Sequence, residues 1–153
     1  MRTQFKTLLG IGLFFFTFSY TANAQILQSR TDIIDTYGTP FCSGTSENGD
    51  SYLYYKYPVT TKNSGTFDQR KVLFFKKNDK GDEICYKWKI LEPSTETKYN
   101  IFSFSRDLVQ TDEMQWKDFG KSIIYDLEEN KGVCKITATY DTEVSLVKTY
   151  KVN

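Results

Sequence analysis

The architecture of this chain follows from two apolar runs, Lys71-Val72-Leu73-Phe74-Phe75 and Ile84-Cys85-Tyr86-Lys87-Trp88-Lys89-Ile90-Leu91. In the second run, bulky side chains at even positions alternate with Cys85, Lys87 and Lys89. A period of two places alternate residues on opposite faces of a β-strand, so Cys85 is expected beside both lysines. The polar segment Asn78-Asp79-Lys80-Gly81-Asp82 contains a glycine, which can adopt positive φ and let the chain reverse. We predict a β-hairpin at the centre of an antiparallel sheet, with Trp88 in the core.

Residues 1–24 have the pattern of an export signal. Residues 1–6 are cationic, residues 7–18 are apolar, and Ala22-Asn23-Ala24 is a small-x-small cleavage site. The apolar run has about a dozen residues, fewer than the ~20 that a membrane-spanning helix needs. We therefore expect residues 1–24 to be a signal peptide and residues 25–153 to be a single domain. The protein is expected to be exported to the bacterial periplasm or the extracellular space, with no membrane span after cleavage.

Charge and composition exclude several classes of function. The chain has 20 basic and 19 acidic side chains, and removal of Arg2 and Lys6 with the signal changes the net charge from +1 to about −1. Such a balance does not provide the basic face that nucleic-acid binding needs. The sequence contains no His, which removes the commonest general base and metal ligand. We expect no metal site, no cofactor and no catalytic residue.

The three cysteines suggest one disulfide, because an exported protein meets an oxidising compartment. Alternation places Cys134 on a face with Ile136 and Ala138, so this thiol is expected to be buried. Cys85 is expected on the lysine-bearing face. Cys42 lies in a loop and can reach either, and the difference in face favours a Cys42–Cys85 bond.

Periodicity and turn residues predict the remaining elements. A helix is expected over residues 25–37, started by Ser29 or Thr31 and ended by Gly38 and Pro40. A second helix is expected over residues 94–110. Further strands are expected over residues 52–57, 112–118, 121–127, 133–140 and 142–152, with loops over 43–51 and 60–67. The predicted fold class is α+β, an antiparallel sheet of about six to seven strands with two helices packed on one face, and the order of elements hints at a duplicated unit.

A resemblance appears in the segments Asp32-Ile33-Ile34-Asp35-Thr36-Tyr37-Gly38-Thr39-Pro40 and Gly49-Asp50-Ser51-Tyr52-Leu53-Tyr54-Tyr55. Over residues 29–91 the chain resembles the small outer-membrane assembly lipoproteins of the SmpA/OmlA type. It also resembles the repeats of the β-lactamase inhibitory protein fold. Both resemblances imply a helix packed on an antiparallel sheet that binds other proteins.

Aromatic content is the unusual feature of the composition, with 12 Phe, 11 Tyr and 2 Trp in the chain. Most of these rings can serve as core and as cross-strand pairs. The functional interpretation is a platform of Tyr52, Tyr54 and Tyr57, because Tyr offers large contact area at low entropic cost. We expect a non-catalytic domain that binds another envelope or secreted protein, or a ligand, through this aromatic-rich sheet. The alternatives are a secreted carboxylate-type hydrolase and a carbohydrate-binding module.

Overall fold

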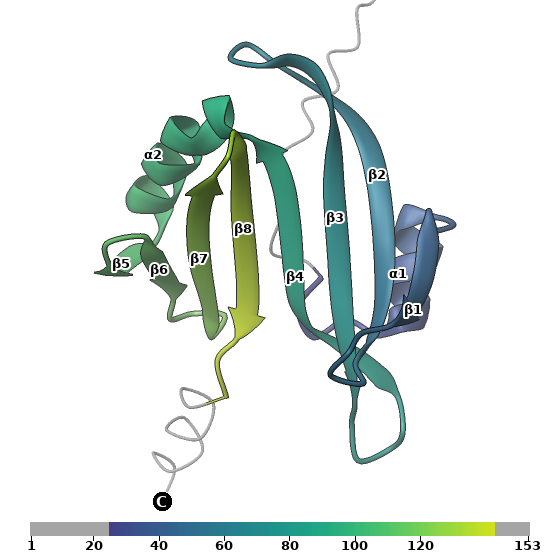
Figure 1. The fold of residues 1–153 in the computed structure, drawn as a ribbon. Helices are drawn as coiled ribbons and strands as arrows, with labels where there is room; N and C mark the ends of the chain where they lie inside the picture. Colours follow the sequence, from purple (N-terminus) through teal and green to yellow (C-terminus); the bar gives the residue numbers. More distant parts are fainter. Residues whose placement is uncertain (1–24, 143–153) are drawn as a thin grey trace, which may run out of the picture.

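The predicted hairpin is present as β3 (Gly65–Lys77) and β4 (Glu83–Pro93), which pair antiparallel. The computed structural model describes residues 25–142, and the hairpin belongs to one antiparallel sheet in the order β1-β2-β3-β4-β8-β7-β6-β5 (Figure 1). The sheet has eight strands, more than the six to seven expected, because two short edge strands escaped the sequence pattern. These are β1 (Cys42–Thr45) and β5 (Val109–Asp112).

The other elements complete two units with the same order, a helix followed by four strands. The first unit contains α1 (Arg30–Tyr37), β1, β2 (Ser51–Thr61), β3 and β4. The second contains a 3-10 turn η1 (Ser94–Glu96), α2 (Thr97–Asp107), β5, β6 (Gln115–Asp118), β7 (Ile123–Asn130) and β8 (Val133–Tyr140). The last strands of the two units, β4 and β8, pair with each other in the middle of the sheet.

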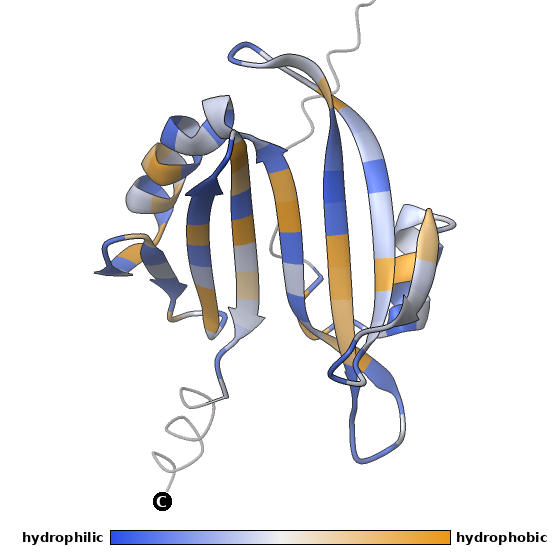
Figure 2. Cartoon of the chain, in the orientation of Figure 1, coloured by the Kyte–Doolittle hydropathy of each residue, from blue (hydrophilic) through white to orange (hydrophobic). Residues whose placement is uncertain are grey.

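One row of buried side chains crosses the sheet and defines what we call the inner face. Leu53 lies opposite Leu73, Leu73 opposite Trp88, and Trp88 opposite Ala138. The row continues through Tyr125 to Trp116, and all six residues are buried. Figure 2 shows the matching alternation of hydrophobic and hydrophilic bands along β4 and β8. The opposite, outer face carries the residues between them in sequence.

A β-bulge in the central hairpin changes the faces predicted for its second strand. Phe74 pairs with Lys87 but Phe75 pairs with Cys85, so Tyr86 is an extra residue that faces no partner. The extra residue shifts the alternation by one. Trp88 and Ile90 are buried as expected, but Cys85 joins them with 0% exposure. The placement of Cys85 on the lysine-bearing face was therefore wrong, and Ile84 and Tyr86 do not share the face of Trp88.

The first helix begins after Ser29, one of the two predicted caps, and is therefore shorter than the expected range of residues 25–37. Ser29 is the N-cap and accepts a hydrogen bond from the Asp32 backbone N–H, so residues 25–28 precede the helix. Gly38, at φ 79°, ends it as predicted. Ile33 is fully buried and Tyr37 packs edge-on against Tyr55, whose hydroxyl donates to the Gly38 carbonyl.

The second helical segment begins at Ser94 with η1, as predicted. α2 ends at Asp107, before the predicted end at residue 110, because β5 begins at Val109. Phe104 of α2 packs against Trp116 and Tyr125 at centroid distances of 5.5 and 5.3 Å. Within residues 25–142, no helix is both long and apolar enough to cross a membrane.

One strand prediction, over residues 52–57, needs correction, and another is not tested. Pro58 does not end β2, which continues to Thr61 paired with β3. The pairing of β2 with β1 ends at Tyr54, and no described strand pairs with β2 on that side beyond it. Pro58 has no backbone N–H to donate, and a strand tolerates proline where that N–H would face an unpaired edge. The strand expected over residues 142–152 lies almost wholly outside the described residues.

Candidate functional site

The outer face carries a surface of aromatic rings and lysines over β2, β3 and β4. We define the outer aromatic surface as Tyr52, Tyr54, Phe74 and Tyr86 together with Lys76, Lys87 and Lys89. The Tyr52 and Phe74 rings meet at 6.4 Å with a 52° tilt. At its β1 edge, Tyr54 contacts Phe41 edge-on at 5.6 Å, and Phe41 is 71% exposed. The rings on this face are tilted rather than coplanar.

The three lysines of this surface sit over its rings. Lys87 Nζ lies 4.7 Å from the Phe74 centroid and 5.2 Å from that of Tyr86, and Lys76 Nζ lies 4.4 Å from Tyr86. Lys89 is 5.7 Å from Phe74. None of the three forms an ion pair with any residue in the described part of the chain. Partial burial, together with neighbouring Lys89, lowers the pKa of Lys87.

Tyr57 does not belong to this surface. It stands an odd number of residues from Tyr52 and Tyr54, so its ring lies on the inner face, stacked on Tyr55 at 5.7 Å and 5°. Burial raises the pKa of Tyr57 to about 12. The structure therefore brings together two of the three tyrosines that the sequence suggested.

The cysteines are all free thiols in this structure. Cys42 is exposed on β1, whereas Cys85 and Cys134 are buried, as expected for Cys134 but not for Cys85. Burial raises the pKa of the Cys85 thiol to about 12 and also raises that of Cys134. Because Cys85 is buried on the inner face, the difference in face no longer favours a Cys42–Cys85 bond, and this pairing stays a prediction.

A cavity of about 490 Å³ lies on the inner face between α2 and the sheet. Its floor includes Trp88, Ile90 and Ile136, and its α2 wall includes Tyr99 and Phe104. The turn that joins β2 to β3, at the end of the sheet where α2 begins (Figure 1), supplies residues 60–63 to the rim. The volume is in the range of small-molecule sites.

Two buried carboxylates line this cavity. Glu92, 9% exposed, accepts hydrogen bonds from Gln69 Nε2 at 2.5 Å and Asn100 Nδ2 at 2.9 Å. Glu96, 4% exposed, accepts from the hydroxyls of Thr61 at 2.6 Å and Ser64 at 2.5 Å. All four donors are neutral, and neither carboxylate takes part in an ion pair among residues 25–142.

Two further polar groups lie at or beside the Trp88 ring, which forms part of the cavity floor. The Trp88 Nε1–H group is buried and has no hydrogen-bond partner among the described residues. Lys71, 7% exposed, places its Nζ 5.1 Å from the Trp88 centroid and forms no ion pair with a described residue. Burial lowers the pKa of Lys71 to about 8.

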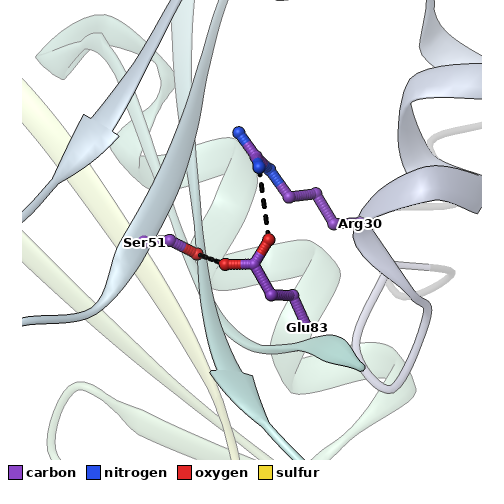
Figure 3. A network of polar contacts seen from close by, with 3 residues as sticks. All are labelled: Arg30, Ser51 and Glu83. Atoms are coloured by element: carbon purple, nitrogen blue, oxygen red, sulfur yellow. Dashed lines mark hydrogen bonds and ion pairs between the residues drawn. The ribbon is translucent and has the colours of Figure 1, made fainter. Parts of the chain in front are cut away.

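A second polar network, between α1 and the sheet, has a structural explanation. Glu83 bridges Arg30 Nη1 at 3.2 Å and Ser51 Oγ at 2.5 Å (Figure 3). The Ser51 hydrogen bond and the Arg30 charge lower the pKa of the Glu83 carboxyl. Because Glu83 joins Arg30 of α1 to Ser51 of β2, this network fixes the first turn of α1 to β2 and β4.

Sequence reasoning identified Tyr52 and Tyr54 but missed Glu92, Glu96 and Lys71. In the sequence, Glu92 and Glu96 flank a strand end and a helix start, where acidic residues are ordinary. Lys71 sits at the beginning of an apolar run, and its burial depends on Trp88 from the next strand. Among the described residues, no group of three or more Cys, Asp or Glu side chains is arranged to hold a metal ion.

Comparison with known proteins gives no relative. No protein-family model matches this chain, and neither the curated proteins nor the solved structures contain a significant match to it.

Proposed function

We propose that this protein is a non-catalytic binding domain that docks an acidic segment of another exported protein on its outer aromatic surface. The observation that carries the proposal is the set of three lysines over Phe74 and Tyr86, none of which forms an ion pair with a described residue. Asp50, the carboxylate beside them, accepts a hydrogen bond from the Tyr86 hydroxyl at 2.5 Å. Aromatic rings with interspersed cations suit a partner that offers carboxylates beside apolar groups. The weak resemblance to protein-binding sheet families over residues 29–91 agrees with this function.

We also propose that α1 and α2 both pack on the inner face, which leaves the outer aromatic surface uncovered. The contact of Tyr37 with Tyr55 and that of Phe104 with Tyr125 support this arrangement. The proposal also includes export, with cleavage before Gln25, because the partner is expected in the same compartment.

The carbohydrate-binding alternative is less well supported by the ring geometry. A sugar platform presents coplanar rings, whereas the outer rings meet at 52° and 90°. The nearly parallel pair, Tyr55 and Tyr57, lies on the inner face. The hydrolase alternative requires two carboxylates that converge on a substrate, and its candidates are Glu92 and Glu96, which line one cavity.

The test uses charge reversal on the outer aromatic surface. A photo-crosslinking residue at position 54 of the exported protein is expected to capture a partner. The double substitution Lys87→Glu, Lys89→Glu is expected to abolish this capture. The purified protein is also expected to bind a labelled peptide of Glu-Leu repeats but not one of Gln-Leu repeats. Salt should weaken this binding, because the Debye length falls from about 10 Å at 0.1 M to about 3 Å at 1 M.

The matched control is Lys98→Glu, which reverses an exposed charge on α2 and away from the outer aromatic surface. Capture and peptide binding should survive this change. Equal capture by the Lys87→Glu, Lys89→Glu variant and the parent protein would reject the outer surface as the docking site.

A further inference from the structure

Contacts between the two units form the rim of the cavity beneath α2. The hydroxyls of Thr61 and Ser64, from the β2–β3 turn, both donate to Glu96 at the start of the second unit, and Ser64 also contacts Thr95. On the other side, Asn100 of α2 reaches down to Glu92 of β4. The cavity is therefore a built site with a fixed rim, and it lies on the face opposite to the outer aromatic surface.

The buried charges around this cavity do not pair with one another: Glu92 and Glu96 are two carboxylates, and the buried amine over the Trp88 ring, Lys71, is within ion-pair distance of neither in the described structure. A buried carboxylate is costly unless a cation compensates it, and Glu92 and Glu96 receive only neutral hydrogen bonds. Asp107 also lines the cavity but is paired with Arg106 at its exposed end. Lys62 lies on the rim, and its Nζ is within ion-pair distance of neither glutamate in the described structure.

The rest of the lining is apolar and aromatic. Trp88, Tyr99, Phe104 and Tyr125 contribute rings, and Ile90 and Ile136 contribute aliphatic surface. Aromatic faces attract cations as well as apolar groups. Trp88, 1% exposed, adds an N–H donor that no protein group accepts.

We propose that this cavity binds a small organic cation, an ammonium group attached to an apolar or aromatic body. The ammonium lies against the Glu92 and Glu96 carboxylates, and the body packs on the rings and the two isoleucines. The site is independent of the proposed protein partner, which occupies the other face. It also gives the two glutamates a role in binding rather than in hydrolysis.

Three probes of nearly equal size test the charge requirement. Phenethylamine carries the cation, 2-phenylethanol is neutral, and 3-phenylpropionate is an anion. Isothermal titration and the quenching of Trp fluorescence are expected to show phenethylamine binding at least tenfold more tightly than 2-phenylethanol, with no binding of 3-phenylpropionate. Equal binding of the first two probes, or absence of phenethylamine binding, would overturn the proposal.

Variants locate the binding site. Glu92→Gln and Glu96→Gln keep an acceptor for the neutral donors but remove the charge, and each should weaken phenethylamine at least tenfold. Glu128→Gln, an exposed carboxylate of β7 that pairs with Lys135, is the matched control and should leave the affinity unchanged. Because a buried substitution can disturb folding, Ser103→Leu provides a second test. It fills the cavity from α2 with both carboxylates intact, and it should also abolish binding.

A disaccharide probe separates this site from the hydrolase alternative. Cellobiose is expected neither to bind nor to be cleaved. Cleavage that Glu92→Gln or Glu96→Gln abolishes would replace the organic-cation site with a carboxylate-type active site. Retained phenethylamine binding in both glutamine variants would place the probe elsewhere and would refute the proposal.

Discussion

The two halves of this molecule share one order of elements but not one size. Strands β2, β3 and β4 of the first unit have 11, 13 and 11 residues. Their counterparts β6, β7 and β8 in the second have 4, 8 and 8. The excess length of β2 and β3 carries the β2–β3 turn to the start of α2, where Thr61 and Ser64 bind Glu96. The longer unit thus supplies part of the rim of the cavity beneath α2.

The two halves also differ in their last strands. Cys85 of β4 and Cys134 of β8 are both fully buried, and each is followed by a lysine on the other face, Lys87 and Lys135 respectively. In β4 the bulged residue Tyr86 intervenes, whereas β8 pairs with β7 without a register shift. The bulge adds an aromatic ring to the outer face of the first unit, and the outer aromatic surface is confined to that unit.

The largest loss of stability is expected when the Trp88 ring, which contacts both halves, is removed. Its ring meets Tyr125 of the second unit at 6.1 Å and lies under Lys71 of the first. Trp88→Ala is expected to cost about 3–5 kcal/mol in the free energy of unfolding, because a large buried ring leaves a cavity. Denaturant titration measures the loss. Phe41→Ala, at an exposed ring, should change the stability by no more than about 0.5 kcal/mol, and a similar small effect at Trp88 would show that this ring is not core.

The next effect concerns the buried amine of Lys71 in the longer unit. Its pKa is about 8 in the folded state against an ordinary 10.5, so between these values the unfolded chain binds more protons. Stability should therefore rise with pH from about 8 to about 10.5, by about 3 kcal/mol at most.

The variant Lys71→Met isolates this contribution from the titration of the tyrosines. It should be more stable than the parent protein at pH 7, and the difference should shrink as the pH approaches 10.5. Denaturation at several pH values measures this difference in the free energy of unfolding. If it stays constant between pH 7 and 10.5, Lys71 is solvated in the folded protein.

The smallest loss of stability is expected at the β2–β3 turn, where Thr61 of the first unit binds Glu96 of the second. Thr61→Val removes one donor to the buried Glu96 carboxylate and is expected to cost about 1.5–3 kcal/mol, the usual range for a hydrogen bond to a charged group. Thr60→Val is the matched control, since Thr60 shares an exposed hydrogen bond with Thr66 across β2 and β3 and makes none to Glu96 in the described structure. Equal loss of thermal stability in both variants would show that the contact with Glu96 does not join the two halves.

Much of the fold could be predicted from local patterns. Alternation in β3 and β8, the Ser29 cap and Gly38 end of α1, and the turn at Gly81 are each specified by residues close together in sequence. Strands β1 and β5 could not be predicted, because Cys42–Thr45 and Val109–Asp112 lack apolar alternation and are strands only through pairing with a neighbour. The continuation of β2 through Pro58 could not be predicted either, because it depends on which edge of the strand is left unpaired in the sheet.

The candidate sites divide in the same way. The sequence by itself determined that Tyr52 and Tyr54 share a face and that Trp88 and Cys134 are buried, because these follow from a period of two. Only the tertiary structure decided that Cys85 is buried, because a bulge depends on the register between two strands. It alone brought Glu92 and Glu96 to one cavity with Trp88 and Tyr125, because a cavity is made by the packing of α2 and a distant turn, which no local pattern encodes.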